Sequence, residues 1–344
     1  MCLSSRRLPP YNSRTFALPN DTEPMSLIDV FNGDADGMCA LHQLRLVEPA
    51  DAVLVTGPKR DISLLKRVNA QAGDRVTVLD IALSKNRDAL DRLLAAGAQV
   101  RYFDHHQPGD IPLHPNFEAH IDTDANVCTS LLVNRYLQGG QLAWAVTAAF
   151  GDNLADAARQ AAAPLTLSDR QLAQLQSLGE CLNYNGYGET LEDLFFDPAA
   201  LYRQLRPFAD PFFFIAESPA YQTLKQGYED DMARAVAVDA TEVRAAGRIF
   251  MLPPEKWARR ISGVFGNRLA VESPTQAHAI LTARPEGGFV VSVRAPLEAR
   301  SGADVLCSRF ETGGGRRGAA GINHLPESEV DRFVHAFYAV FTRS

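Results

Sequence analysis

The chain has 344 residues, enough for two domains, because single hydrophobic cores stop growing near about 250 residues. Hydrophobic residues make up 46% and charged residues 22%, as in globular proteins, and no apolar run approaches the roughly 18 residues of a membrane span. The net charge of −7 argues against a protein that grips long duplex DNA.

The five cysteines argue for a reducing compartment, because their number is odd and no pair has CxxC spacing. Residues 1–24 lack the apolar block of a signal peptide, although Arg6, Arg7 and Arg14 loosely resemble a transit peptide. We favour a disordered tail, or a misplaced start codon with the true start at Met25. These features predict a cytoplasmic protein with no membrane contact.

The first part of the chain alternates short apolar runs with helical spacing. Such alternation predicts βαβ units, a parallel sheet and helices on both faces. We assign residues 25–155 to this domain. The predicted strands are residues 27–31, 52–57, 75–83 and 99–106, and the predicted helices are residues 38–47, 61–70 and 86–96.

The rest of the chain predicts a helical connector and a smaller domain. Residues 127–150 read as one helix, and helices with loops continue to about residue 240. We therefore predict an α/β protein with a helical extension and linker over 156–243 and a smaller α/β domain over 244–344. The strands predicted there are residues 248–252, 278–284 and 289–296, and a helix over 326–342 closes the chain.

Acidic residues and histidines follow three of the predicted strands. Asp34 and Asp36 come after the first, Asp80 closes the third, and residues 104–106 (Asp-His-His) close the fourth. Ligands of parallel sheets bind at the carboxyl ends of the strands, so these side chains are expected at one edge. Each motif alone also fits an ordinary acidic turn, a helix cap or surface histidines.

Asp152, after the helical run 127–150, supplies a further carboxylate or caps the next helix. Carboxylates together with neutral imidazoles suit Mn²⁺ or Mg²⁺, with Zn²⁺ or iron less suited. The sequence therefore predicts a divalent-metal site at the sheet edge.

Four segments, FNGDADG, VLDIA, YFDHHQP and AFGDN, resemble in order the four motifs of the DHH family of phosphoesterases, the superfamily of nanoRNases and RecJ-like nucleases. GGGRRGAAG at 313–321 is similar to the glycine signature of the DHH-associated C-terminal domain, and SVRAP at 292–296 to the strand with its phosphate-contacting arginine. The resemblance spans roughly residues 27–340.

The resemblance implies a site for two metal ions, usually Mn²⁺, with Mg²⁺ or Co²⁺ as substitutes. Such ions activate a water for in-line attack on phosphorus. By motif position, Asp34 holds one ion, Asp36 the other, and Asp80 bridges both. His105 and Asp152 complete the second ion, His106 contacts the water or phosphate, and Asp104 orients the histidines.

The sequence departs from the family pattern at two positions. Asn32 stands where many members have a histidine ligand of the first metal, so it offers at best a neutral oxygen. Arg316 replaces the histidine of the glycine signature. For substrate binding the resemblance implies Arg294 together with Gly313, Gly314, Gly315, Arg316 and Arg317, since backbone amides and arginines bind phosphate.

The expected substrate is a short oligonucleotide or small nucleotide, bound by a monomer or homodimer. Alternatives within enzymes are a single-strand 5′ exonuclease of longer substrates and a phosphatase of 3′-phosphoadenosine 5′-phosphate. The absence of a basic and aromatic single-strand track argues mildly against the exonuclease. A non-catalytic nucleotide-binding regulator is the alternative from a different class, motivated by Asn32 and Arg316.

Overall fold

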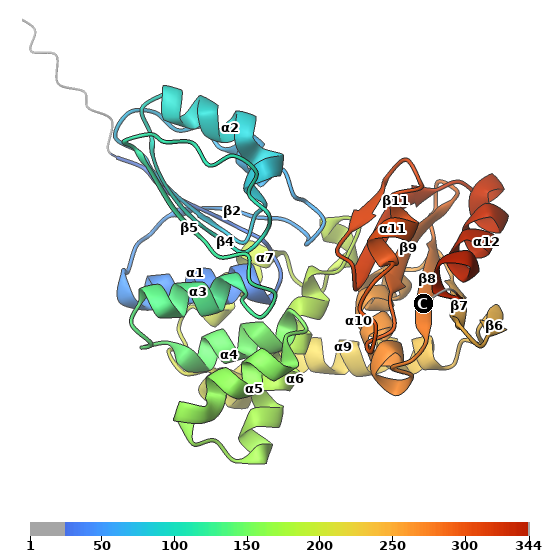
Figure 1. The fold of residues 1–344 in the computed structure, drawn as a ribbon. Helices are drawn as coiled ribbons and strands as arrows, with labels where there is room; N and C mark the ends of the chain where they lie inside the picture. The colour runs from blue at the N-terminus through green and yellow to red at the C-terminus, as the bar shows by residue number, and fades with distance from the viewer. Residues whose placement is uncertain (1–24, 343–344) are drawn as a thin grey trace, which may run out of the picture.

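The structure is a computed structural model that describes residues 25–342 (Figure 1). The tail predicted over residues 1–24 lies outside the described residues. Within residues 25–342, no helix is both long and apolar enough to cross a membrane. The four cysteines of this range, Cys39, Cys128, Cys181 and Cys307, are free and buried.

A parallel sheet of five strands, in the order β2-β1-β3-β4-β5, forms the core of the first domain. All its strand pairs are parallel, as the βαβ pattern predicted. Four of the strands lie where apolar runs predicted them, whereas β5 was not predicted. The strands are β1 Leu27–Phe31, β2 Val53–Val55, β3 Arg75–Leu79, β4 Gln99–Asp104 and β5 Phe117–Ile121.

Successive residues of the central strands point to opposite faces, and each face is covered by helices. Val30, Val78 and Tyr102 belong to the core on the face of α2 and η1, whereas Phe31 and Leu79 belong to the core on the other face. Figure 1 shows the sheet between these two layers. The covering elements are α2 Leu83–Ala95 and η1 Leu64–Arg67 on one side, and α1 Ala35–Val47, α3 Thr129–Tyr136 and α4 Leu142–Gly151 on the other.

Two helix predictions differ from the structure. The helix predicted over 61–70 is only the short η1. The single helix predicted over 127–150 is divided into α3 and α4, because Gln138 and Gly139 adopt left-handed backbone angles (φ 58° and 87°). A second glycine, Gly140, follows and continues the turn.

The connector is helical, as predicted, and its helix α6 packs tightly on α4. A Cβ at Gly179 of α6 would lie 2.0 Å from the carbonyl oxygen of Thr147, so the two backbones touch. The connector contains α5 Ala155–Ala162, η2 Ala163–Leu165, α6 Asp169–Gly186, η3 Leu191–Asp193, α7 Pro198–Leu205, α8 Pro211–Glu217 and α9 Pro219–Val236.

The C-terminal domain is a six-stranded sheet in the order β10-β11-β9-β8-β7-β6. Its pairs are antiparallel except β7 with β8. The three predicted strands and the closing helix are present, and α10, α11 and the outer strands are additional. The elements are β6 Glu242–Arg244, β7 Gly247–Leu252, α10 Lys256–Glu272, β8 Ala277–Ala283, β9 Phe289–Arg294, α11 Ala303–Cys307, β10 Gly313–Gly315, β11 Ala319–Leu325, η4 Glu327–Glu329 and α12 Val330–Phe341.

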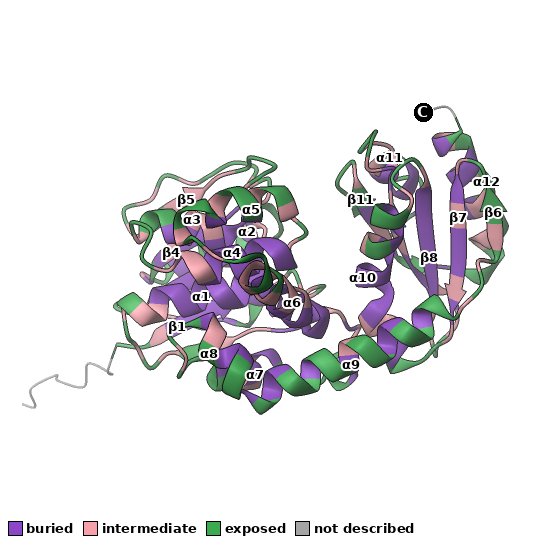
Figure 2. Cartoon of the chain, turned by 90° about the horizontal axis from the view of Figure 1, so that it is seen from below, coloured by how far each residue is buried: buried purple, intermediate pink, exposed green. Residues whose placement is uncertain are grey.

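Helices α6 and α9 connect the two domains. Tyr184 of α6 and Met232 of α9 share a core with Phe250, Trp257 and Phe265 of the C-terminal domain. Figures 1 and 2 both show β11 on the side of that domain nearest the parallel-sheet domain, and β6 on the far side. The predicted glycine signature therefore belongs to the near side.

Candidate metal centre

The predicted acidic residues come together at the carboxyl edge of the parallel sheet. Asp34 and Asp36 lie at the start of α1, directly after β1. Asp80 follows β3, and Asp152 follows the last residue of α4. Asp34, Asp36 and Asp80 are at most 3% exposed, so three carboxylates are withdrawn from water within one cluster. Such a cluster is costly unless a cation or hydrogen-bond donors balance it.

Asp80 turns sharply away from the strand that carries it. Its φ of 58° is left-handed, a region that aspartate enters more readily than most residues. Its backbone N–H still donates to the carbonyl of Phe103, so the strand pairing continues to this residue. Non-glycine residues in this region cluster at functional sites, and here the conformation accompanies a carboxylate in the acidic cluster.

His105 is the centre of the cluster. Its Nδ1 is 2.8 Å from the carbonyl oxygen of Val127, so this nitrogen carries the proton and donates it there. The other ring nitrogen, Nε2, lies 3.5 Å from Asp80 Oδ1, 3.7 Å from Asp152 Oδ2 and 4.0 Å from Asp36 Oδ2. Ligands bound at about 2.1 Å to one ion lie roughly 3–4 Å apart, so these spacings fit a shared cation.

Asp36 is fixed by the N-terminus of α3. The backbone amides of Thr129 and Ser130 each donate to one of its oxygens at 2.7 Å. The hydroxyl of Thr129 lies 3.3 Å from Asp80 Oδ1. These donors orient two of the carboxylates, and the α3 amides at these two residues are engaged by Asp36.

Burial and the close approach of the carboxylates perturb the pKa values within the cluster. Burial raises the pKa of Asp36, and it raises that of Asp80 well above its usual range, with the neighbouring Asp34 adding to the effect. Burial disfavours the charged form of His105, but Asp80, Asp36 and Asp152 outweigh it and raise the pKa of His105 to about 10.

One carboxylate oxygen of the cluster is unsatisfied. Asp152 Oδ2 is buried and has no hydrogen-bond partner among residues 25–342, while it lies 3.7 Å from His105 Nε2. Buried polar atoms without partners are rare in native proteins, so this one needs an explanation. Two groups of ligand atoms could each hold a metal ion, Asp36 with His105 and Asp152, and Asp80 with His105 and His106, and the two groups share His105.

His106 is held differently from His105. Its Nδ1 lies 2.8 Å from Asp104 Oδ1, and its side chain is 33% exposed. Asp104 itself is fully buried. The predicted pairing of Asp104 with the histidines is therefore seen with His106, whose Nε2 remains available to a ligand.

Lys59 is the residue that the sequence analysis missed. It lies in the loop after β2, and its Nζ is 2.6 Å from Asp34 Oδ2 and 3.4 Å from Asp152 Oδ1. Burial disfavours the ammonium, but Asp34 outweighs it and raises the pKa of Lys59 well above its usual range. The signal that could have found Lys59 was its position, because β2 ends at the same edge as the other strands.

Asn32, predicted as a weak metal ligand, is engaged by the backbone. Its Oδ1 accepts a 3.3 Å hydrogen bond from the N–H of Asp34. The side chain is 7% exposed, so it lies within the buried cluster and helps to orient Asp34.

Arg294, the predicted phosphate ligand, is bonded within its own domain. Its guanidinium donates to Asn267 Oδ1 at 2.6 Å, to Ser292 Oγ at 3.0 Å and to the carbonyl of Gly263 at 3.0 Å. Gly263 also contacts the connector, since a Cβ there would lie 2.6 Å from the Tyr187 ring. Arg294 is therefore anchored beside the point where α10 meets the end of α6.

The glycine signature forms a hairpin. Gly313, Gly314 and Gly315 form β10, which pairs with β11. Arg316 and Arg317 lie at the exposed turn between the strands, where Arg316 and Ala319 exchange backbone hydrogen bonds. The structure thus separates Arg294, which is partly buried, from Arg316 and Arg317, which are exposed.

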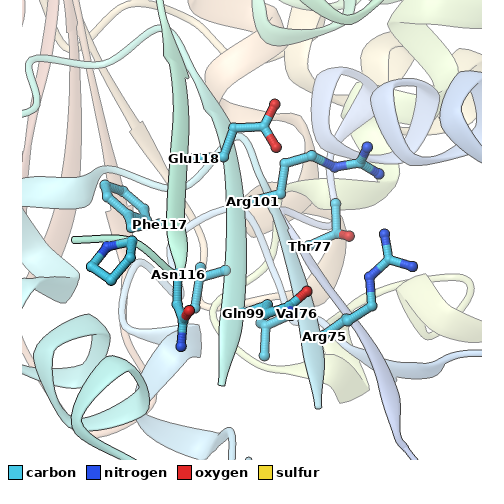
Figure 3. A pocket seen from close by; sticks show the side chains of 10 residues that line it. Arg75, Val76, Thr77, Gln99, Arg101, Asn116, Phe117 and Glu118 are labelled. Atoms are coloured by element: carbon cyan, nitrogen blue, oxygen red, sulfur yellow. The ribbon is translucent and has the colours of Figure 1, made fainter. Parts of the chain in front are cut away.

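A cavity of about 320 Å³ opens at the opposite edge of the parallel sheet (Figure 3). It is lined by the first residues of β3 and β4 and by the segment that leads into β5, including Arg75, Arg101 and Asn116. Arg101 is engaged there by Glu48 at 2.7 Å, and Asn116 donates to Gly97. Ligands of parallel sheets bind at the carboxyl ends of the strands, so this cavity is not the candidate site.

No protein-family model matches the chain, and no curated protein is significantly similar to it. Among solved structures, a DHH domain described as a member of the s1p family of ribosomal proteins has a TM-score of 0.60 and 16% identity over 92% of this chain and 86% of its own. RecJ from Thermus thermophilus in complex with Mn²⁺ has a TM-score of 0.58 and 17% identity, over 93% of this chain but 52% of RecJ.

A third structure is the pGpG-specific phosphodiesterase PggH from Vibrio cholerae. Its TM-score is 0.52 and its identity 14%, and the match covers 92% of this chain and 99% of PggH. The chain therefore has the fold of DHH-domain proteins, as the order of its motifs predicted.

Proposed function

We propose that this chain, which has the fold of DHH-domain proteins, hydrolyses a phosphoester bond of a short oligonucleotide or small nucleotide with the help of a divalent metal ion. The observation that carries the proposal is the convergence of Asp36, Asp80 and Asp152 on Nε2 of His105. We propose Mn²⁺ as the ion, with Mg²⁺ or Co²⁺ as substitutes, since RecJ binds Mn²⁺.

The residues of the cluster have distinct proposed roles. Asp36, Asp80, His105 and Asp152 would hold the ion, which supplies Lewis acidity toward a phosphoryl oxygen and lowers the pKa of water. The hydrogen bond from His105 Nδ1 to Val127 fixes the ring so that Nε2, once it has lost its proton, would face the ion. Asp104 positions His106 so that its Nε2 can exchange a proton with substrate or water.

A small substrate is favoured by size and charge. The match covers 99% of a pGpG-specific phosphodiesterase but only 52% of RecJ. We therefore propose a substrate of the size that the phosphodiesterase takes. The net charge of −7 also disfavours long nucleic acid. For the non-scissile end we propose Arg316 and Arg317, which are exposed at the turn between β10 and β11.

The experiment is Mn²⁺-dependent hydrolysis of a labelled series from dinucleotides to about 24-mers of RNA and DNA. The series includes cyclic dinucleotides and 3′-phosphoadenosine 5′-phosphate. We expect turnover that is highest for the shortest members and falls at least 100-fold in His105→Ala. His335→Ala, which removes an exposed histidine of α12, is the matched control and should retain full activity.

The outcomes separate the alternatives. Preference for the longest members would replace the small-substrate proposal with the 5′ exonuclease, and turnover of 3′-phosphoadenosine 5′-phosphate alone would indicate the phosphatase. No turnover of any member with Mn²⁺, Mg²⁺ or Co²⁺ would refute the hydrolase. Circular dichroism of both variants must match the wild type for the comparison to count.

A nucleotide-binding regulator without turnover is the second candidate. It is favoured by the neighbourhood of Asp34, where Asn32 and Lys59 take up a carboxylate that the family resemblance assigns to a metal ion. Tight, saturable binding of a member of the series, with no product after prolonged incubation with Mn²⁺, would support this candidate.

A further inference from the structure

Lys59 places a positive charge inside the carboxylate cluster. Its Nζ has three acceptors, Asp34 Oδ2 at 2.6 Å, Asn183 Oδ1 at 3.1 Å and Asp152 Oδ1 at 3.4 Å. An ammonium group has three N–H donors, so every donor has a partner. The three acceptors of the lysine are the residue before α1, the residue after α4 and a residue of α6.

The lysine is held by backbone contacts as well as by charge. The N–H of Lys59 donates to the carbonyl of Gly186 at 2.9 Å, and its Nζ lies 5.6 Å from the centre of the Tyr187 ring. The carbonyl oxygen of Gly57, two residues earlier, packs against Gly33, since a Cβ on Gly33 would lie only 2.2 Å from that oxygen. The loop after β2 is thus clamped between the first motif and the end of α6.

Asp34 has its oxygens engaged by the chain. Its Oδ1 caps α1 by accepting hydrogen bonds from the N–H groups of Asp36 and Gly37 at 3.0 and 3.1 Å, and its Oδ2 accepts from Lys59. Asn32 Oδ1 in turn accepts from the N–H of Asp34. By contrast, Asp152 Oδ2 has no partner within residues 25–342. Lys59 therefore neutralises the cluster at Asp34, whereas Asp152 Oδ2 remains able to bind an ion.

We propose that the ammonium of Lys59 takes the place of one of the two cations that the family resemblance implies, so that the centre binds a single divalent ion on Asp36, Asp80, His105 and Asp152. This inference rests on the metal site of the proposed function. A divalent ion bound to Asp34 would lie against the ammonium, and like charges at that distance repel strongly in a buried site. The lysine then offers its charge to a phosphoryl oxygen as a fixed part of the protein.

The test is the number of Mn²⁺ ions bound per chain, measured by calorimetric titration and by counting unbound Mn²⁺ with electron paramagnetic resonance. We expect one ion for the wild type and one for Asp34→Asn, since asparagine also caps helices. We expect two for Lys59→Met, with the low-temperature spectrum of a spin-coupled Mn²⁺ pair. Lys66→Met, which changes an exposed lysine of η1, is the matched control and should bind one.

Two ions in the wild type, loss of an ion in Asp34→Asn, or a single ion in a folded Lys59→Met variant would each overturn the inference. Should Lys59→Met not fold, the wild-type and Asp34→Asn counts still decide. The count is independent of turnover: a chain that binds one Mn²⁺ and hydrolyses nothing keeps this inference and refutes the phosphoesterase. A chain that binds no Mn²⁺ refutes both.

Discussion

The crossing of α4 and α6 determines where Asp152 lies, and it can be perturbed without touching a ligand. A Cβ at Gly179 would stand 2.0 Å from the carbonyl oxygen of Thr147 and 2.9 Å from the backbone nitrogen of Gly151. Both neighbours are backbone atoms that cannot rotate away, so Gly179→Ala must separate the helices by about 1 Å. Over-packing of this kind costs about 3 kcal/mol at the upper end. Alanine regains about 1 kcal/mol of helix propensity, which leaves a net loss of about 2 kcal/mol.

The assay combines urea unfolding with a calorimetric Mn²⁺ titration. We expect the free energy of unfolding to fall by about 2 kcal/mol. The affinity for Mn²⁺ should fall at least tenfold, because Asp152 follows the displaced Gly151. Gly140→Ala is the control, since Gly140 is exposed and its nearest atom lies 3.8 Å away. Unchanged stability in Gly179→Ala, or lower stability with full Mn²⁺ affinity, would refute the reasoning.

Three further outcomes are expected. Asp80→Asn should stay folded, because asparagine tolerates the left-handed φ. In thermal unfolding, Mn²⁺ at 100 times its Kd should stabilise the wild type by about 2.7 kcal/mol and should not stabilise this variant. Mn²⁺ binding at pH 8 should release at least one proton, because the pKa of His105 is about 10 without the ion and only the neutral ring can bind the ion. Calorimetry in two buffers of different ionisation enthalpy measures the number of protons released, and binding without proton release would contradict this expectation. Burial lowers the pKa of His42 to about 4, so below about pH 6.5 the unfolded chain binds a proton that the folded chain does not bind. As the pH falls from 7 to 4, the free energy of unfolding should therefore drop by about 3 kcal/mol more in the wild type than in His42→Gln. Urea unfolding at both pH values measures this difference.

Apolar periodicity predicted the central strands but not the elements that tertiary contacts create. The edge strand β5 was not predicted, although the alternation of Phe117, Ala119 and Ile121 with Glu118 and His120 is typical of a strand with one solvated face. The helix α10 was missed although it has 17 residues, because Gly263 and Gly266 weaken its helical pattern. The structure gives a reason for Gly263, where any side chain would collide with the Tyr187 ring.

The strand-end rule predicted which carboxylates would meet, since it depends only on where each strand stops. It could not predict the glycine hairpin, because a run of three glycines has no side-chain alternation by which a strand is recognised. Lys59 also follows a strand end, but the rule does not say which residues there will meet the carboxylates. Its place depends on the contacts of its loop with Gly33 and Gly186, which are 26 residues before and 127 residues after it in the chain.

The residues at positions 32 and 59 both bear on the charge of Asp34, and we expect each to depend on the other. A histidine at position 32 could offer a ring nitrogen to an ion beside Asp34, whereas the asparagine oxygen already accepts a hydrogen bond from the N–H of Asp34. If no ion binds there, as we propose, the buried Asp34 needs another positive charge, and Lys59 Nζ lies 2.6 Å from its carboxylate. Conversely, a lysine at that point would repel an ion held by a histidine. We therefore expect the two positions to vary together among chains of this fold, and an alignment in which histidine at position 32 commonly accompanies lysine at position 59 would contradict the compensation argued here.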